Sequence, residues 1–279
     1  MMYDQLSERH YRQIAAVIEQ NVGIKLPPSK RTMVEGRLRK RVRALGLRGV
    51  DDYCRALFED GQFDSEYVHL VDMVTTNKTD FFREPEHFDF LRDEAVPALL
   101  DARAGDRRLK IWSAASSTGA EAYTVAMVLD DKLRSAAVPF RYSILGTDVS
   151  TEVVAQATRA VYPDDMLAPI PAEFRRRYVL RPRNAGRQEF RIAPELRARA
   201  RFHHLNLMDA TYPVDRDVDV VFCRNVLIYF DRPTQHAVLT RLTGHLRPGG
   251  YLILGHSESA AGGNLDGMRQ LMATVWRRQ

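Results

Sequence analysis

Residues 219–231 read Asp-Val-Val-Phe-Cys-Arg-Asn-Val-Leu-Ile-Tyr-Phe-Asp, and the prediction of the fold starts from this stretch. Its first part, Asp219 to Cys223, is a short apolar run rich in β-branched and aromatic side chains, which predicts a strand buried on both faces. In an open α/β sheet, ligands bind beyond the carboxyl ends of the strands, so Arg224, Asn225 and Tyr229 are candidates for a ligand crevice. The alternative is that Arg224 and Asn225 only begin a loop and that Tyr229 belongs to the core.

The composition is that of a soluble globular protein with room for two domains. The chain has 279 residues, of which 45% are hydrophobic and 28% are charged. Its two cysteines, Cys54 and Cys223, are far apart, which argues against a disulfide framework or a Cys-based metal site and suits a reducing cytoplasm. The N-terminus lacks a signal-peptide pattern and no apolar run approaches about 18 residues, so we expect a cytoplasmic protein that does not insert into membranes.

Positive charge is concentrated in one segment. The chain has a net charge of +5 and a pI near 9.3, which indicates an acidic partner but leaves nucleic acid, an anionic membrane surface and an acidic protein open. Between Lys25 and Arg48 there are nine basic residues against a single acid, Glu35, a net charge of +8.

The first 75 residues are predicted to form an all-helical domain. Apolar residues recur at three- and four-residue spacing from Tyr11 to Ile18. A further helix is expected from about Lys30 to Leu45, with Ser29 as its N-cap. The side chains expected to face inward from this helix are those of Val34, Leu38, Val42 and Leu45.

The basic residues of the same helix predict a docking surface for an acidic partner. Four of them, Lys30, Arg37, Arg41 and Arg48, fall within one narrow stripe at 100° per residue. A solvated helix face is the alternative, but the near-absence of acids favours docking. No aromatic residues interleave with the stripe, which disfavours single-stranded nucleic acid. The predicted substrate-docking residues are Lys30, Arg37, Lys40 and Arg41.

A strand, a loop of small residues and a helix follow one another from Leu109 onward. Residues 114–119 form the loop after the predicted strand Leu109 to Ser113, and small side chains there allow a ligand to approach the backbone. The pattern is weak because it lacks Gly-x-Gly-x-x-Gly, and no Lys follows Gly119, which disfavours a phosphate-binding P-loop. After the next strand, Arg141 to Gly146, Asp148 is placed either to bind ribose hydroxyls or to cap the helix that begins near residue 151.

Further strands alternate with helices, which predicts a parallel sheet covered by helices. A Pro- and Arg-rich insertion at about 163–196 interrupts this order. The remaining predicted strands are Tyr178–Arg181 and Glu189–Ile192 in the insertion, and Arg201–Leu205, Tyr251–Leu254 and Thr274–Arg277 in the sheet.

Four runs of residues are distinctive enough to indicate a family. They are Thr75-Thr76-Asn77-Lys78-Thr79-Asp80-Phe81-Phe82-Arg83-Glu84, the loop run from Ile111 to Gly119, the run Phe222 to Asp231, and Gly255-His256-Ser257-Glu258. These four runs, and the order in which they occur, resemble the CheR family of chemotaxis receptor methyltransferases. The resemblance covers nearly the whole chain.

The resemblance implies an α/β fold. An N-terminal all-helical, receptor-docking domain (1–75) and an inter-domain linker and helix (76–104) would precede a Rossmann-like class I S-adenosylmethionine-dependent methyltransferase domain (105–279) with a small β-insertion. The implied reaction transfers a methyl group from S-adenosylmethionine to glutamate side chains of chemoreceptor cytoplasmic helices. Its products are glutamyl methyl esters and S-adenosylhomocysteine. We expect a monomer that binds receptor helices and not nucleic acid.

The resemblance also implies roles for individual residues. Arg83 and Tyr229 would orient the incoming carboxylate. Glu121 would bind the methionine amino group, and Asp148 the ribose. The full set of implied cofactor-binding residues is Asn77, Thr79, Arg83, Glu121, Asp148, Asn206, Leu207, Arg224 and Asn225, the last four around adenosine.

Two features depart from the family pattern. Members often have Gly-Glu-Glu-Pro-Tyr after the small-residue loop, whereas this chain has Gly-Ala-Glu-Ala-Tyr at 119–123, which retains Glu121. The insertion near residues 180–191 lacks the glycine pattern with which members grip a receptor's C-terminal tail peptide. The resemblance therefore does not extend to that contact.

The implied chemistry needs no general base and no metal. A glutamate side chain has a pKa of about 4.3 and is ionised at neutral pH. A tight bidentate clamp would blunt such a nucleophile, so we expect Arg83 and Tyr229 to position it loosely. Three alternatives remain: a nucleic-acid methyltransferase, favoured by the basic pI; a cofactor-binding scaffold without catalysis; and a dinucleotide oxidoreductase, which the missing glycine fingerprint disfavours.

Overall fold

The chain folds into two compact units. The computed structural model describes residues 5–279 except 104, 106, 185, 260 and 262–264. One unit comprises the residues up to Thr76 together with Val149–Thr151, and the other comprises Asn77–Asp148 and Glu152–Gln279. The segment predicted as a linker thus belongs to the second unit from Asn77 onward; its predicted last residue, 104, lies outside the described residues.

The first unit is built from helices. Its α1 starts at Ser7, whose hydroxyl accepts a hydrogen bond from the N–H of His10, and stops at Gly23, which has a φ of 76° that glycine adopts without strain. Buried apolar side chains from every helix form one core, to which Ile14, Ile18 and Leu38 contribute. The elements are α1 Glu8–Val22, the 3₁₀ turn η1 Pro28–Lys30, α2 Arg31–Ala44, α3 Val50–Phe58 and α4 Phe63–Val74.

Two predictions about α2 are wrong. Ser29 lies inside η1 and does not cap the helix, because the chain makes a 3₁₀ turn before α2 starts; the N-cap position is Lys30, which makes no side-chain capping bond. Leu45 is 39% exposed, because α2 ends at Ala44 and Leu45 leaves the inward face.

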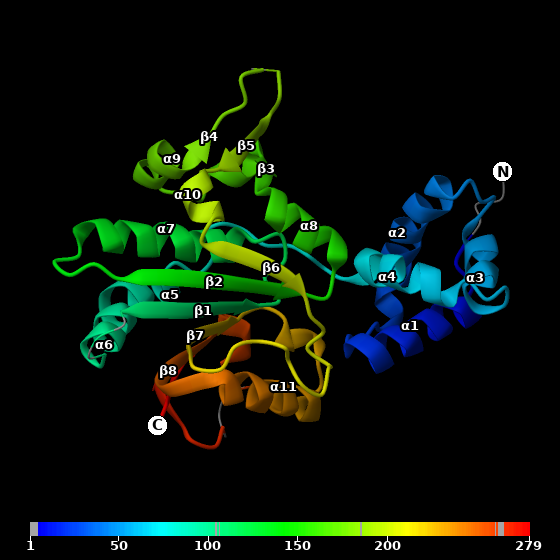
Figure 1. Cartoon of the computed structure of the whole chain (residues 1–279). Coiled ribbons are helices and arrows are strands. Elements are labelled where there is room, and N and C mark those ends of the chain that lie inside the picture. Colours follow the sequence, from blue (N-terminus) through cyan, green and yellow to red (C-terminus); the bar gives the residue numbers. More distant parts are fainter. Residues whose placement is uncertain (1–4, 104, 106, 185, 260, 262–264) are drawn as a thin grey trace. The chain divides into compact units, whose positions relative to one another are not determined.

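The second unit is organised by a seven-stranded sheet with the order β6-β2-β1-β7-β8-β10-β9 (Figure 1). The first five strands pair in parallel, while β10 runs antiparallel to both β8 and β9. The hairpin strand β9 was not predicted, since its residues are mostly exposed and lack an apolar pattern. The strands are β1 Arg108–Ala114, β2 Arg141–Asp148, β6 Ala200–His204, β7 Val218–Cys223, β8 Leu246–Leu254, β9 Met268–Met272 and β10 Val275–Arg278.

The strand order reverses between β1 and β7. From β1 the chain builds outward through β2 and β6 on one side, and later through β7 and β8 on the other. Where the strand order reverses in this way, loops from the carboxyl ends of neighbouring strands diverge, and open α/β sheets bind ligands in the crevice that forms there.

Helices lie on both sides of this sheet, as the parallel pattern predicts (Figure 1). Ile111 of β1 packs in the core that includes α7, whereas the next residue, Trp112, points to the other side and contacts Tyr212 and His245. The helical elements are α5 Glu86–Phe90, the π-helical η2 Leu91–Ala95, α6 Val96–Asp101, α7 Ala120–Ser135, α8 Thr151–Arg159, α11 Arg232–His245 and the 3₁₀ turns η4 Leu227–Tyr229 and η5 His256–Glu258.

The predicted insertion forms a second, three-stranded sheet of order β3-β5-β4, which stands apart from the main sheet in Figure 1. Both predicted strands are present, and the additional strand β3 has only three residues, too few for a visible alternation. Its elements are β3 Val161–Pro163, η3 Asp164–Leu167, α9 Ala172–Tyr178, β4 Val179–Leu180, β5 Glu189–Ile192 and α10 Pro194–Arg197. Across the described residues of the chain, no helix is both long enough and apolar enough to cross a membrane.

Candidate active site

The polar and aromatic run that ends at Glu84 is anchored to the crevice by hydrogen bonds. The Ser117 hydroxyl, in the loop after β1, donates to the carbonyl of Asn77 over 2.9 Å. The N–H of Phe82 donates to the Thr124 hydroxyl on α7 over 3.1 Å. Residues 77–84 therefore have a defined path at the carboxyl edge of the sheet.

The two aromatic residues of this run explain why its composition differs from that of a flexible linker. The Phe81 ring lies 5.0 Å from the Tyr162 ring and 5.9 Å from the Phe190 ring, both in the insertion. The Phe82 ring stacks on Phe174 of α9 at 5.3 Å. Fully buried Phe81 thus ties the run to the small sheet, which leaves the following residues to face the crevice.

Arg224, at the end of β7, is the centre of the site's polar network. Its side chain is 2% exposed. Its Nη1 donates to Glu121 over 2.8 Å, and its Nη2 donates to Glu84 over 3.1 Å and to the carbonyl of Arg83. The guanidinium also lies over the Phe88 ring, 5.4 Å from its centroid. One side chain therefore joins β7 to the first turn of α7 and to the 77–84 run.

Glu121 is the acid that faces the crevice from α7. It is buried, and its two oxygens accept from Arg224 and, over 2.7 Å, from the Ser113 hydroxyl of β1. A carboxylate has about four lone-pair sites, so Glu121 retains acceptor capacity for a ligand ammonium group.

Asp148 is the last residue of β2, which extends two residues beyond its predicted end at Gly146, and the Asp148 side chain is buried. Its Oδ2 accepts from the N–H of Ser117 over 2.8 Å, which holds the small-residue loop against β2. Its backbone carbonyl accepts from the N–H of Leu205 over 2.9 Å. This bond brings the loop that holds Asn206 and Leu207 next to Asp148, so three predicted ligand residues share one end of the crevice.

The predicted carboxylate-orienting residues lie on the two segments that Arg224 joins. The Arg83 side chain is 39% exposed and donates to the carbonyl of Lys78 over 3.4 Å. Tyr229 ends the turn η4, and no described residue hydrogen-bonds its hydroxyl. Asn225, between them, donates from Nδ2 to Glu84 over 3.2 Å.

Backbone conformations that non-glycine residues adopt at a cost concentrate in these segments. Such positions cost of order 1–3 kcal/mol each and persist where surrounding contacts enforce them. In the described part of the chain, the non-glycine residues with positive φ are Phe82, Glu84, Ala115, Ser117 and Asn225 at the site, and Ala160 and Asp217 elsewhere.

The structure brings most predicted site residues together and adds partners that the sequence did not indicate. Asn77, Glu121, Asp148, Arg224 and Asn225 all belong to the network described above, while Thr79 is half-buried in the same run. No role was predicted for the residues that hold them, namely Glu84, Ser113, Ser117 and Glu258. All four lie inside the distinctive runs, which is the only signal that pointed to them.

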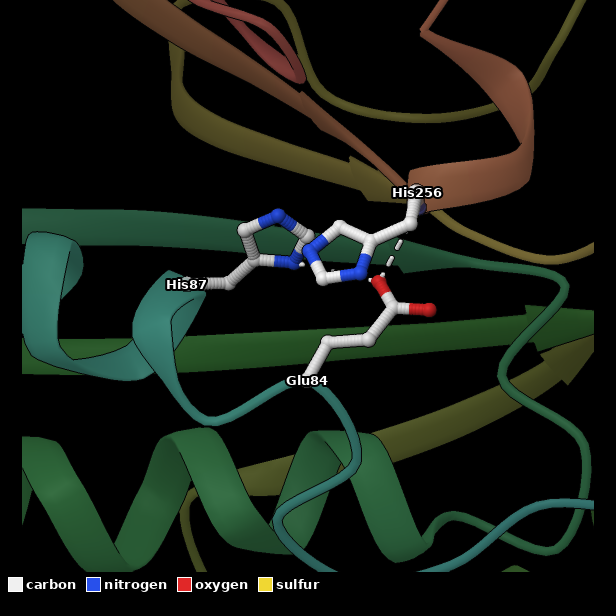
Figure 2. A group of neighbouring side chains, drawn as sticks. All are labelled: Glu84, His87 and His256. Atoms are coloured by element: carbon white, nitrogen blue, oxygen red, sulfur yellow. Dashed lines mark hydrogen bonds and ion pairs between the residues drawn. The ribbon is translucent and has the colours of Figure 1, made fainter.

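Glu84, His87 and His256 form a group whose nitrogen and oxygen atoms lie within 4.8 Å of one another, close enough to hold a metal ion (Figure 2). Figure 2 shows both imidazole rings beside the Glu84 carboxylate, and Nδ1 of His87 is 3.5 Å from Oε2 of Glu84. Burial is the main cause that lowers the pKa of His87, to about 4, so this imidazole is neutral at pH 7.

The surroundings of this group favour a hydrogen-bond network over a metal site. Arg224 approaches the same Glu84 carboxylate, and its positive charge would oppose a cation. Burial alone would raise the pKa of Glu84, but Arg224 and Asn225 outweigh it and lower that pKa. His87 Nε2 is 2.8 Å from the Thr274 hydroxyl, and His256 Nε2 pairs with Glu86. We therefore assign the group to the support of the Arg83–Glu84 segment.

In the helical unit, the predicted basic stripe is wrong as a helix face. Only Arg37 and Arg41 lie on α2, because Lys30 precedes it and Arg48 follows it. Arg37 donates to the carbonyls at the end of α4, 2.8–3.1 Å away, and Arg41 forms a bidentate pair with Glu66 at 2.6 and 2.9 Å.

The charge available for docking therefore lies elsewhere in the segment. Lys30 and Lys40 are exposed, and no described residue forms an ion pair with either of them. The docking role of all four predicted residues stays a prediction, but these two lysines offer the positive charge that the fold does not use.

Comparison with known proteins identifies the family. Residues 77–276 match the family model described as the CheR methyltransferase, SAM binding domain, and residues 9–75 match the CheR methyltransferase, all-alpha domain. This chain belongs to the CheR methyltransferase family. The predicted α/β fold with an N-terminal helical domain and a class I methyltransferase domain is confirmed, as is the predicted cofactor: the chain is an S-adenosylmethionine-dependent methyltransferase.

Relatives in the CheR family are similar over almost the whole chain. The chemotaxis protein methyltransferase of Escherichia coli K12 is 39% identical over 91% of this chain and 85% of its own length. Chemotaxis protein methyltransferase 2 of Pseudomonas aeruginosa is 38% identical over 92% and 86%, and the Borreliella burgdorferi protein is 33% identical over 88% and 86%.

The crevice has the chemical features that S-adenosylmethionine requires. Two acids, Glu121 and Asp148, are buried at this edge of the sheet, and S-adenosylmethionine has an ammonium group and ribose hydroxyls that can donate hydrogen bonds to such acids. Three buried polar atoms at the same edge, the hydroxyls of Ser116 and Thr118 and Nε of Arg224, have no partner among the described residues. Buried polar atoms are normally hydrogen-bonded, so these atoms indicate a polar ligand.

Proposed function

We propose that this protein methylates glutamate side chains of chemoreceptor cytoplasmic helices, producing glutamyl methyl esters, and that it acts in the cytoplasm as a monomer. The relatives are named chemotaxis protein methyltransferases. The observation that supports a carboxylate substrate is the half-exposed guanidinium of Arg83, held beside a crevice in which Arg224 is already paired with Glu121 and Glu84. Both cysteines are buried free thiols, in keeping with a reducing compartment.

The proposed roles divide the crevice between cofactor and substrate. Glu121 would accept from the methionine ammonium group and Asp148 from the ribose hydroxyls, with Asn77, Thr79, Asn206 and Leu207 around them. Bound S-adenosylmethionine supplies a methyl group attached to a positively charged sulfur, and the neutral thioether that remains after transfer is a good leaving group. Arg224 and Asn225 would hold the walls in place through Glu121 and Glu84.

The substrate carboxylate would be oriented by Arg83 and Tyr229. A glutamate oxygen forms the new bond to the methyl carbon as the carbon–sulfur bond breaks, and no proton is transferred. The Arg83 guanidinium is held weakly, by a 3.4 Å hydrogen bond to the carbonyl of Lys78 and a 4.0 Å ion pair with Glu84, so it is able to turn toward an incoming carboxylate. Positioning of anion and methyl group is then the main contribution of the protein to the rate.

Removal of either orienting group should lower turnover without preventing cofactor binding. Because misplacing reacting groups by about 1 Å costs about 10²-fold in rate, we expect Arg83→Ala to lose about 10²-fold and Tyr229→Phe about 10-fold in turnover. The assay uses methyl-labelled S-adenosylmethionine and a glutamate-rich receptor helical hairpin, with base-labile label as the readout. Calorimetry measures cofactor affinity.

Arg269→Ala, at an exposed position on β9, is the matched control and should keep full activity. Full turnover in both Arg83→Ala and Tyr229→Phe would refute the orienting role. Base-stable label, or label transferred to RNA, would refute the glutamate substrate, and cofactor binding without any transfer to the source organism's receptors would indicate a scaffold.

We further propose that the helical unit attracts receptor helices through the exposed lysines of its basic segment. Receptor methylation helices are rich in glutamate, and complementary charge raises association rates by about 10-fold or more at low salt. Lys30→Glu with Lys40→Glu should therefore lower kcat/KM for the receptor by about 10-fold at low ionic strength and much less at high salt.

The control for this experiment has the same change in net charge at a different place. Arg216→Glu with Arg269→Glu changes two exposed residues of the other unit, and Arg216 precedes β7 at the amino end of the sheet, away from the crevice. Equal losses of kcat/KM in both double variants, or a loss that salt does not alter, would contradict specific docking by the helical unit.

A further inference from the structure

The run Gly255–Glu258 has no role in the function proposed above, yet its last residue is among the most heavily hydrogen-bonded side chains of the molecule. Glu258 is 3% exposed. Its Oε1 accepts from the backbone N–H groups of Val226 and Leu227 at 2.8 and 2.6 Å. Its Oε2 accepts from the N–H groups of Asn225 and Gly255 at 2.7 and 2.9 Å. A single buried carboxylate thus binds four backbone donors.

Three of these donors, the N–H groups of Asn225, Val226 and Leu227, lie at the start of the turn η4, and the fourth, Gly255, is the N-cap of η5, the turn that contains Glu258. The first N–H groups of a helical turn have no partner within the turn, and a side chain that accepts their hydrogen bonds caps the turn as an N-cap residue does. Here the acceptor comes from a residue more than thirty positions away, on the loop after β8. The bonds also hold Asn225 at its positive φ of 60°, a conformation that a free loop would seldom adopt.

Glycine at 255 is required for this arrangement. A Cβ at that position would lie 2.8 Å from Oε2 of Glu258 and 2.8 Å from Nδ2 of Asn225. Atoms that close must move apart, so any side chain at 255 would displace the carboxylate from its donors. Two residues of the run, Gly255 and Glu258, therefore have one shared purpose.

The other end of η4 is held by Gln235, on the first turn of α11. Its Nε2 donates to the carbonyl of Leu227 over 2.9 Å and to that of Phe230 over 3.1 Å. The turn between them contains only two backbone hydrogen bonds, from Tyr229 to Val226 and from Phe230 to Leu227. So short an element has little stability of its own, and its geometry depends on the two side chains that hold its ends.

We propose that Glu258 and Gln235 are positioning residues that hold η4 from both ends and thereby set the place of the Tyr229 side chain. Because no described residue binds the Tyr229 hydroxyl, its position depends on the backbone of the turn. This inference rests on the proposed role of Tyr229 in orienting the substrate. We call the pair the η4 clamp.

The first test measures the clamp without catalysis. Hydrogen exchange of the backbone amides of residues 225–230 is compared in the wild type, Glu258→Gln and Gln235→Leu. Glu258→Gln removes one carboxylate oxygen that accepts two backbone hydrogen bonds, and Gln235→Leu removes two hydrogen bonds donated to backbone carbonyls. Each variant should speed amide exchange in this segment by about 10-fold or more. Unchanged protection of the segment in both variants would overturn the clamp.

The second test couples the clamp to catalysis. Gln235→Leu should lower kcat by about 10-fold and leave cofactor affinity within about twofold, since Gln235 does not touch the predicted cofactor residues. In a Tyr229→Phe background the same substitution should cost less than about threefold, because the hydroxyl that the clamp positions is absent. Gln188→Leu and Glu94→Gln, both at exposed positions, are the matched controls.

The outcomes separate the clamp from the function on which it rests. Equal loss of kcat from Gln235→Leu in both backgrounds shows that the clamp does not act through Tyr229 and overturns the inference. Wild-type turnover of Tyr229→Phe, together with faster exchange in the clamp variants, refutes the catalytic role of Tyr229 while supporting the clamp as the support of η4.

Discussion

Replacing Arg224 by Leu is expected to abolish cofactor binding and to destabilise the methyltransferase unit by about 3–5 kcal/mol, the usual cost of leaving a buried charge without its partner. The side chain is 2% exposed and is paired with both Glu121 and Glu84. Its removal therefore leaves two neighbouring carboxylates without a counter-charge. Repulsion between them would open the wall that joins α7 to the 77–84 run.

Chemical denaturation and calorimetry with S-adenosylhomocysteine measure the two effects. Arg216→Leu, which removes an exposed arginine from the same unit, should change neither by more than about 0.5 kcal/mol. A variant Arg224→Leu with wild-type stability and cofactor affinity would show that the polar network does not support the crevice. Restoring much of the stability with Glu121→Gln in the Arg224→Leu background would confirm that stranded charge is the cause.

Replacing Arg41 by Met is expected to destabilise the helical unit by about 3 kcal/mol, at the lower end for a buried ion pair because the Arg41 side chain keeps 22% exposure. Its bidentate partner Glu66 is 6% exposed and would be left buried without a counter-charge. Arg43→Met, on the exposed side of the same helix, is the matched control and should have little effect.

The pH dependence of stability gives a second readout of this pair. The hydrogen bond from Arg41 is the first cause that lowers the pKa of Glu66 in the folded state. A lowered folded pKa adds stability above the ordinary glutamate pKa of about 4.3, and that stability is lost as the pH falls through the folded value. The wild type should therefore lose stability on acidification, whereas Arg41→Met should lose much less. Equal acid sensitivity in both proteins would contradict this role of Arg41.

The structural role of Arg41 limits which residues can be used to test the docking surface. Charge reversal at Arg37 or Arg41 would remove contacts inside the helical unit, so a loss of methylation could reflect unfolding of that unit. Lys30 and Lys40 avoid the difficulty because their charges have no partner among the described residues.

Local patterns in the sequence were enough to predict most of the strands of the main sheet and the chemical class of the site. Short runs of strand-forming residues bounded by polar residues placed β1, β2, β6 and β7 to within two residues, and β7, which is buried along its whole length, has the clearest composition. The distinctive runs brought Arg83, Glu121, Asp148 and Tyr229 into one functional hypothesis, and the family and the cofactor were confirmed by comparison. Local patterns suffice for such features because backbone geometry and burial act over a few residues.

Which charged side chains hold the fold together depends on contacts between distant residues and could not be predicted from the sequence. Arg37 and Arg41 looked like docking residues in the sequence, but carbonyls at the end of α4 and the carboxylate of Glu66 occupy them. Likewise, nothing local to Glu258 or Arg224 reveals partners that lie 31 to 141 positions away. A charged side chain is chemically the same whether it faces solvent or a buried partner, and the partner is set by strand order and helix packing, which bring distant residues within hydrogen-bond distance.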